Sequence, residues 1–212
     1  MGDNAELITH LSTMPSVNAP RLLFIWGDAG TGKTHLLKAI TQATNQRAEF
    51  VSAANELLIN ALPFILAAPS LPPVLAIDNI ELLAQSALDT VFALQNRVRQ
   101  SEHCSLVISS GLSPAQLALA LEPRSDIVSR LSWGLTLRVH ALTDDNKVAA
   151  LSHFLNQRGT QYSADVLNYL LTHQSRNIKD LALLLDHIDR YAFSHKRAIT
   201  IPLVKQFLST QL

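Results

Sequence analysis

The chain has 212 residues, 48% of them apolar and 16% charged, with 17 basic and 17 acidic side chains. This composition supports a hydrophobic core and excludes a largely disordered chain. The neutral balance argues against strong non-specific binding to DNA or to an anionic membrane surface. The single cysteine, Cys104, excludes a disulfide scaffold, and we expect it to be a buried structural thiol.

The amino-terminal residues and the longest apolar stretch indicate where in the cell the protein is expected. The chain starts with polar residues and shows no basic, apolar leader. The apolar stretch 57–75 is interrupted by Asn60 and four prolines, which argues against a membrane-spanning helix. Together with the lone cysteine, these features predict a soluble, cytoplasmic protein with no membrane partner.

Strands and helices are predicted to alternate over the first 140 residues. Short apolar runs predict strands at 22–26, 48–52, 74–77, 105–110 and 135–139. The spacing of apolar residues predicts helices at 4–12, 33–44, 55–67, 82–98, 114–121 and 126–131, with a bend or break at Pro63 in the third. Such alternation is typical of a parallel sheet with helices on its faces.

The pattern changes at Thr143, after which only helices are predicted. They cover 144–157, 164–173, 175–193 and 202–210, with Thr143 and Ser163 as N-caps of the first two. We therefore predict an α/β domain over residues 1–141 and a small all-helical domain over residues 142–212.

The residues between the first strand and the helix that follows read GDAGTGKT and fit the pattern G-x-x-x-x-G-K-[ST]. We call residues 27–34 the glycine loop. Glycines let consecutive backbone N–H groups point inward, and the next helix offers its free N–H groups to the same anion. A plain strand–turn–helix connection needs one glycine, not three followed by Lys-Thr.

The glycine loop predicts binding of ATP or ADP together with Mg²⁺. Lys33 is expected to reach the β- and γ-phosphates, and the Thr34 hydroxyl to hold the metal. The predicted nucleotide-binding residues of this segment are Gly27, Asp28, Ala29, Gly30, Thr31, Gly32, Lys33, Thr34 and His35.

Asp78 ends the apolar run Val74–Ile77. A carboxylate at the tip of a parallel strand lies where ligands gather in such sheets, so we expect Asp78 to help hold Mg²⁺; the alternative is a helix N-cap. The next residue is Asn79, whose amide cannot accept a proton from water as a second carboxylate would. Glu81 is not expected to point at the phosphates, so hydrolysis by this chain alone is predicted to be slow or absent.

Five segments together resemble the DnaA-related AAA+ family. They are "FIWGDAGTGKTHLLKA", "LAIDNIE", "SDIVSRLSWGL", "LTDDNKVAAL" and "AITIPLVKQFL". The resemblance implies a five-stranded parallel sheet with a helical lid. Within the family it is strongest to the regulatory inactivators of DnaA. Those proteins bind nucleotide, attach to the replication sliding clamp and promote hydrolysis of the ATP held by DnaA. The DNA-binding domain that ends DnaA has no counterpart here.

The resemblance assigns Arg130, in "SRLSWGL", as an arginine finger that acts on a neighbouring subunit. A permanently charged guanidinium can neutralise phosphate charge that develops during hydrolysis. The alternative is an arginine that only stabilises the negative end of its helix. Arg124 is the weaker candidate for a finger and is expected to be a solvated surface charge.

The resemblance also assigns two sensor positions. Ser109 and Ser110 end the fourth strand and match the polar sensor, although capping of the strand end is an equal alternative. Lys179 falls where relatives have the arginine of the lid sensor, and Arg176 is close enough in sequence to substitute for it.

The expected partners are DnaA and, through an edge-projecting Arg130, a second copy of the chain. The resemblance also implies the sliding clamp as a partner, but the chain begins Met1-Gly2-Asp3-Asn4 without the glutamine- and leucine-rich docking peptide, which argues against clamp binding by this chain. The clamp-like segment Gln116–Leu121 is expected to face a helix core instead.

Two other functions remain open from the sequence. One is a DnaA-like or helicase-loader-like replication ATPase that acts on DNA, which the neutral charge disfavours. The other is a small-molecule P-loop kinase, which the few arginines of the helical tail disfavour.

Overall fold

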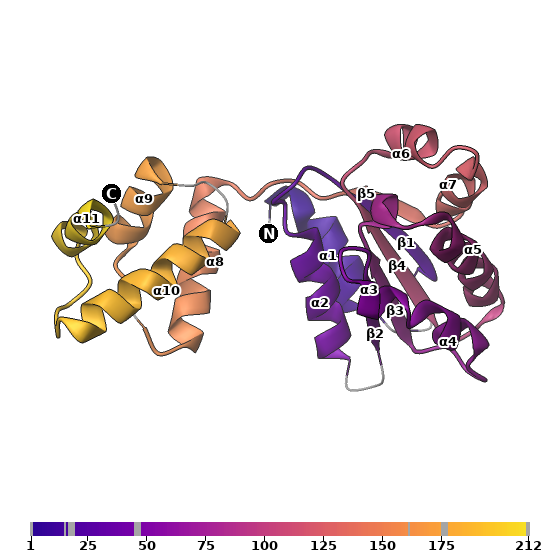
Figure 1. The fold of residues 1–212 in the computed structure, drawn as a ribbon, viewed down its shortest axis with the longest axis horizontal. Helices are drawn as coiled ribbons and strands as arrows, with labels where there is room; N and C mark the ends of the chain where they lie inside the picture. The colour runs from indigo at the N-terminus through magenta and orange to yellow at the C-terminus, as the bar shows by residue number, and fades with distance from the viewer. Residues whose placement is uncertain are drawn as a thin grey trace. The chain divides into compact units, whose positions relative to one another are not determined.

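A computed structural model describes residues 2–14, 16, 20–44, 48–160, 162–174 and 178–210. The chain divides into two compact units, Met1–Ala141 and Leu142–Leu212, and each is described by itself (Figure 1). No described helix is both long enough and apolar enough to cross a membrane.

The first unit is built on a sheet of five parallel strands, as the sequence predicts. The strands are β1 (Leu22–Trp26), β2 (Glu49–Ser52), β3 (Val74–Asp78), β4 (Ser105–Ser110) and β5 (Leu135–Arg138). Their order across the sheet is β2-β3-β4-β1-β5. β1 therefore lies between β4 and β5, and the loop that leaves its carboxyl end opens beside the ends of β4 and β3.

Helices cover both faces of this sheet (Figure 1). One face packs on α1 (Ala5–Ser12) and α2 (Lys33–Ala43). The other face packs on α4 (Leu62–Ala67), α5 (Gln85–Gln100), α6 (Pro114–Ala120) and α7 (Ser125–Leu131). The remaining elements are η1 (Gly2–Asn4), α3 (Glu56–Ile59) and η2 (Ile80–Leu82).

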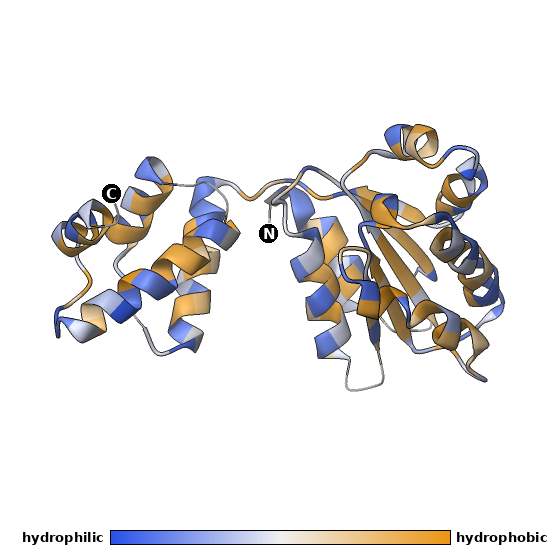
Figure 2. Ribbon diagram, viewed as in Figure 1, coloured by the Kyte–Doolittle hydropathy of each residue, from blue (hydrophilic) through white to orange (hydrophobic). Residues whose placement is uncertain are grey.

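Alternation along the strands separates the two halves of this core. In β1, Phe24 belongs to the cluster under α5, whereas Leu23 and Ile25 belong to the cluster under α2, and all three are fully buried. Successive strand residues point to opposite faces, so an apolar run with no polar break is needed where both faces are covered. In Figure 2 the strands are coloured as hydrophobic, whereas the helices that cover the sheet carry both hydrophobic and hydrophilic residues.

Two predicted helices differ from the structure. The segment 55–67 forms the separate helices α3 and α4, which part at Asn60 and Ala61 rather than at Pro63. Pro63 lies in the first turn of α4, where a proline costs no helical hydrogen bond. The helix predicted at 82–98 begins later, at Gln85, because Ile80–Leu82 forms a 3₁₀ turn first.

The clamp-like segment Gln116–Leu121 lies largely in α6, where Leu117 and Leu121 are buried as expected. The Gln116 side chain completes a capping box with Ser113 at the start of this helix.

The second unit consists of helices around its own core. They are α8 (Asp144–Gln157), α9 (Ala164–His173), α10 (Ile178–Ser194) and α11 (Ile201–Ser209), and leucines from α8, α9 and α10 dominate the buried cluster. The two predicted N-caps are confirmed: Thr143 Oγ1 accepts the Asn146 N–H at 3.3 Å, and Ser163 Oγ accepts the Val166 N–H at 3.4 Å.

Candidate nucleotide site and arginine pocket

The glycine loop connects β1 to α2 and needs its glycines for different reasons. Gly30 has φ 79° and Gly32 has φ 97°, in the left-handed region that residues with a Cβ rarely adopt. At Gly27 the reason is space, because a Cβ there would lie 2.5 Å from the Val139 carbonyl oxygen. Replacing any of these glycines would force the loop to change shape.

Lys33 folds back over the glycine loop. Its side chain is buried, and its ammonium group donates to the Gly27 and Asp28 carbonyl oxygens at 2.6 and 2.9 Å. Burial lowers the pKa of Lys33 below its usual value, while the negative charges of Glu81, Asp78 and Asp28 oppose this shift. These two hydrogen bonds hold the end of the Lys33 side chain at the mouth of the loop.

Asp78 joins the glycine loop to the ends of β3 and β4. It is 1% exposed, and each carboxylate oxygen accepts one hydroxyl: Oδ2 from Thr34 at 2.7 Å, and Oδ1 from Ser109. Asn79 donates its backbone N–H to the Ser109 hydroxyl oxygen at 3.1 Å. The structure therefore brings together the predicted metal ligands, Thr34 and Asp78, and one predicted sensor.

Ser110, the second predicted sensor residue, lies elsewhere. Its hydroxyl oxygen accepts the Leu112 N–H at 2.9 Å, and its carbonyl oxygen accepts the Gly27 N–H at 3.3 Å. These bonds close the turn after β4, which is the strand-end alternative that the sequence left open.

Glu81 makes a contact beside the site that the sequence did not predict. Its Oε1 accepts the Gly111 N–H at 2.8 Å, just after β4, whereas its buried Oε2 has no partner among the described residues. Among the nearby carboxylates, Glu81 has the strongest influence on the pKa of Lys33. A second acid is therefore present beside the site, two residues after the position where Asn79 stands.

The outer part of the glycine loop is exposed. Asp28, Ala29 and Gly30 are exposed, as is His35 at the start of α2. The Thr31 hydroxyl donates to the Asp28 carbonyl oxygen at 2.9 Å, and the Asp28 carboxylate lies 3.5 Å from Arg138 at the end of β5.

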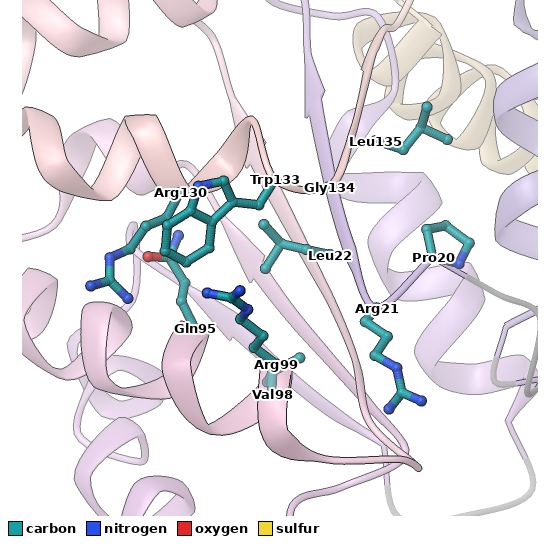
Figure 3. Close-up of a pocket in the computed structure, with 10 residues that line it drawn as sticks. All are labelled: Pro20, Arg21, Leu22, Gln95, Val98, Arg99, Arg130, Trp133, Gly134 and Leu135. Carbon is teal, nitrogen blue, oxygen red and sulfur yellow. The ribbon is translucent and has the colours of Figure 1, made fainter.

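Arg130 lies at the other end of the sheet. Together with Leu22 at the start of β1 and Leu135 at the start of β5, it lines a pocket of about 410 Å³ (Figure 3). The glycine loop follows the carboxyl end of β1, and the five residues of that strand span roughly 13 Å. Arg130 is therefore remote from the glycine loop of its own chain.

The Arg130 guanidinium is held between aromatic rings rather than extended from the edge. It lies 3.7 Å from the ring centre of Phe92 and 4.9 Å from that of Trp133, and it donates to the Asn96 side-chain oxygen. Stacking and hydrogen bonding fix its position before any partner arrives. We call the hollow it lines the arginine pocket; Arg21 and Arg99 also line it.

The expectation for Arg124 was wrong. Its side chain is 17% exposed, pairs with Asp89 and Asp126, and lies over the Phe92 ring. The ion pair lowers the pKa of Asp126 below its usual value. Arg124 is thus a paired structural charge.

The two predicted lid-sensor residues belong to the second unit. Arg176 lies outside the described residues, and for Lys179 the structure describes only a backbone position in α10. Among the described residues there is no cluster of three or more His, Cys, Asp or Glu that could hold a metal ion.

Known proteins share this fold. AMPPCP-bound DnaA from Aquifex aeolicus has a TM-score of 0.69 and 20% identity, over 92% of this chain and 64% of that one. Domain III of DnaA from Thermotoga maritima has a TM-score of 0.78 and 20% identity, over 99% and 92%. A RuvB variant from Thermotoga maritima has a TM-score of 0.71 and 14% identity, over 98% and 67%. The chain thus spans less than two thirds of the length of the Aquifex aeolicus structure.

A parallel sheet with a glycine loop, followed by a helical lid, defines the AAA+ class of ATPases. Residues 144–208 match the family described as Hda, lid domain. Together with the likeness to the fold of DnaA, this match supports a relation to the DnaA/Hda group of AAA+ proteins.

Proposed function

We propose that this chain is an adenine-nucleotide-binding regulator of replication initiation, which promotes hydrolysis of ATP held by DnaA and does so through Arg130. The lid match to Hda and the fold of DnaA domain III support the choice of partner. The AMPPCP bound to one DnaA neighbour supports nucleotide binding at the glycine loop.

The nucleotide would lie against the glycine loop and the start of α2. Backbone N–H groups and Lys33 would hold the phosphates, because the lysine already lies at the mouth of the loop. Thr34 and Asp78 offer the oxygen ligands that Mg²⁺ prefers. When bound there, Mg²⁺ supplies charge neutralisation at the β- and γ-phosphates.

The observation that carries the proposal is the position of Arg130. It lies near the amino ends of β1 and β5, whereas the glycine loop follows the carboxyl end of β1. One molecule therefore cannot bring the two together without unfolding the sheet. A guanidinium fixed on one edge can still enter the site of a second molecule, where such fingers raise hydrolysis rates by roughly 10³- to 10⁵-fold.

The chain alone is expected to hydrolyse ATP slowly. Asn79 cannot accept a proton from water, and one oxygen of Glu81 is already bound to the Gly111 N–H. Turnover of the purified chain, measured by phosphate release, should stay well below one per second. Turnover of many per second would favour the alternative, a self-sufficient replication ATPase.

The direct test compares Arg130→Ala and Arg130→Lys with the parent chain in an assay of DnaA-bound ATP. Both variants should lose the stimulation, because lysine keeps the charge but lacks the planar fork. Arg158→Gln is the control, since Arg158 also stacks on a ring, that of Phe154, but lies in the lid. Unchanged nucleotide affinity would show that each variant is folded. Stimulation that survives Arg130→Ala would reject the proposal.

Self-association belongs to the same proposal. Arg130 of one copy would enter the nucleotide site of a second copy, in the same way as it is proposed to enter that of DnaA. Sedimentation of the chain with and without ADP would test this directly.

A further inference from the structure

Three arginines line the arginine pocket, and no acidic residue does so among the described residues. Arg21, Arg99 and Arg130 line it together with Gln95, Trp133 and aliphatic side chains. None of the three arginines pairs with a carboxylate among the described residues, whereas Arg124, Arg138 and Arg158 all do. Like charges around one hollow repel each other, so this arrangement favours the arrival of an anion.

Trp133 holds two of these arginines in place. The guanidinium of Arg99 lies 4.7 Å and that of Arg130 lies 4.9 Å from its ring centre (Figure 3). Trp133 is nonetheless 56% exposed, which is unusual for so large an apolar side chain. Because its ring already carries two guanidinium groups, stacking of a nucleobase on it is disfavoured.

The arginines favour a ligand with acceptors, whereas Gln95 favours a ligand with a hydrogen-bond donor. Gln95 is 2% exposed, and its Nε2 donates to the Ile127 carbonyl oxygen at 3.4 Å, whereas its Oε1 has no partner among the described residues. A buried acceptor without a donor destabilises the folded state, so a ligand that donates to it is favoured. A polyphosphate has only acceptors to offer, so it would satisfy the arginines and leave Gln95 unpaired. A peptide carries both carboxylates and backbone N–H groups.

The remaining wall of the pocket is aliphatic and comes from Leu22, Val98 and Leu135. A volume of about 410 Å³ is more than one carboxylate needs and is in the range of peptide and small-molecule pockets. The pocket therefore suits an acidic residue beside an aliphatic one.

We propose that the arginine pocket binds an acidic–aliphatic peptide segment of the partner ATPase and so anchors that partner beside Arg130. This inference rests on the proposed function for one point only, namely that the partner ATPase is DnaA. In this account Arg130 acts on the nucleotide, whereas Arg21 and Arg99 bind protein. The two roles predict different kinetic effects.

The first test separates affinity from rate. Arg99→Gln and Arg21→Gln should each raise the chain concentration that gives half-maximal stimulation of DnaA-bound ATP hydrolysis, by about tenfold. The maximum rate at saturation should stay within about twofold of the parent chain, and Arg158→Gln should change neither value.

Two results would overturn the anchor. One is an unchanged half-maximal concentration in both variants. The other is a fall in maximum rate alone, which would place Arg99 on the phosphates. If Arg130→Ala keeps full stimulation, the proposed function fails, and the second test decides the pocket independently.

The second test needs no partner. The Lys33→Ala chain, whose glycine loop is impaired, is titrated with acetyl-Leu-Glu-Leu-Asp-amide while the indole N–H signal of Trp133 is followed by NMR. The signal should shift to saturation, and Arg99→Gln added to that chain should abolish the shift. A response to tripolyphosphate or to a thymidine oligonucleotide, with none to the peptide, would overturn the proposal in favour of a phosphate ligand.

Discussion

The Lys33 ammonium group would have different hydrogen-bond acceptors before and after a nucleotide binds. It neutralises the loop carbonyls of Gly27 and Asp28, which otherwise point partial negative charge at an incoming phosphate. Arrival of a nucleotide would exchange these acceptors for charged ones, which form stronger hydrogen bonds.

We expect Lys33→Ala to weaken ATP binding by roughly 10- to 100-fold, the equivalent of one lost charge-assisted hydrogen bond. Isothermal titration calorimetry measures this directly. Lys38→Ala is the matched control, because Lys38 lies on the same helix, exposed and over the Phe50 ring. Equal ATP affinity in the Lys33 variant and the control would refute the role of the loop.

Cys104 precedes β4 and is 2% exposed. Burial raises the pKa of its thiol from 9.0 to about 12, with Arg97 and Arg21 partly opposing the shift. Because the thiolate is the reactive form, the folded chain should react with a disulfide reagent at pH 8 far more slowly than the unfolded chain. Reaction at the unfolded rate would contradict this burial.

The same thiol predicts a dependence of stability on pH. The unfolded thiol ionises near its ordinary pKa of 9.0, while the folded thiol stays protonated to about 12. Its contribution to stability is therefore complete below pH 9 and is lost as the pH rises towards 12. The free energy of unfolding of the parent chain, minus that of Cys104→Ala, should fall over this window. A flat difference would contradict the raised pKa.

At the scale of elements, the sequence predicts those features that depend on residues close together in the chain. The glycine loop, the N-caps at Thr143 and Ser163, and the apolar run of β3 are each set by neighbours in sequence, so the sequence predicts them. The break at Asn60 was missed, because Pro63 reads as a helix breaker until its place in a first turn is known.

Contacts between distant segments could not be predicted. Glu81 meets Gly111 across 30 residues, and Arg130 meets Asn96 across 34. Arg124 looked solvated because Asp89, one of its partners, lies on another helix. The arginine pocket combines β1, α5, α7 and β5, and no single stretch of sequence displays it.

The cap of α8 gives a test at this scale. Thr143→Ala should reduce the stability of the helix start by about 1 kcal/mol, because the Asn146 N–H loses its acceptor. Amide hydrogen exchange should show faster exchange at Asn146, and Thr143→Ser should restore most of the protection. Unchanged exchange in the alanine variant would mean that Thr143 does not act as the cap.

For the molecule as a whole, the sheet separates the two proposed sites. Its carboxyl edge gathers the glycine loop, Asp78 and Ser109 into the proposed phosphate site, and its amino edge carries Arg130 and the arginine pocket. A protein built this way can hold a nucleotide at one edge while it acts on a second molecule from the other.

The most direct measurement is a single-turnover assay of ATP already bound to DnaA, at saturating concentrations of the parent chain and of Arg130→Ala in parallel. The parent chain should accelerate phosphate release, and the variant should lose about 10³-fold or more of that acceleration while it still binds nucleotide. Equal rates for the two chains would contradict catalysis across the two molecules.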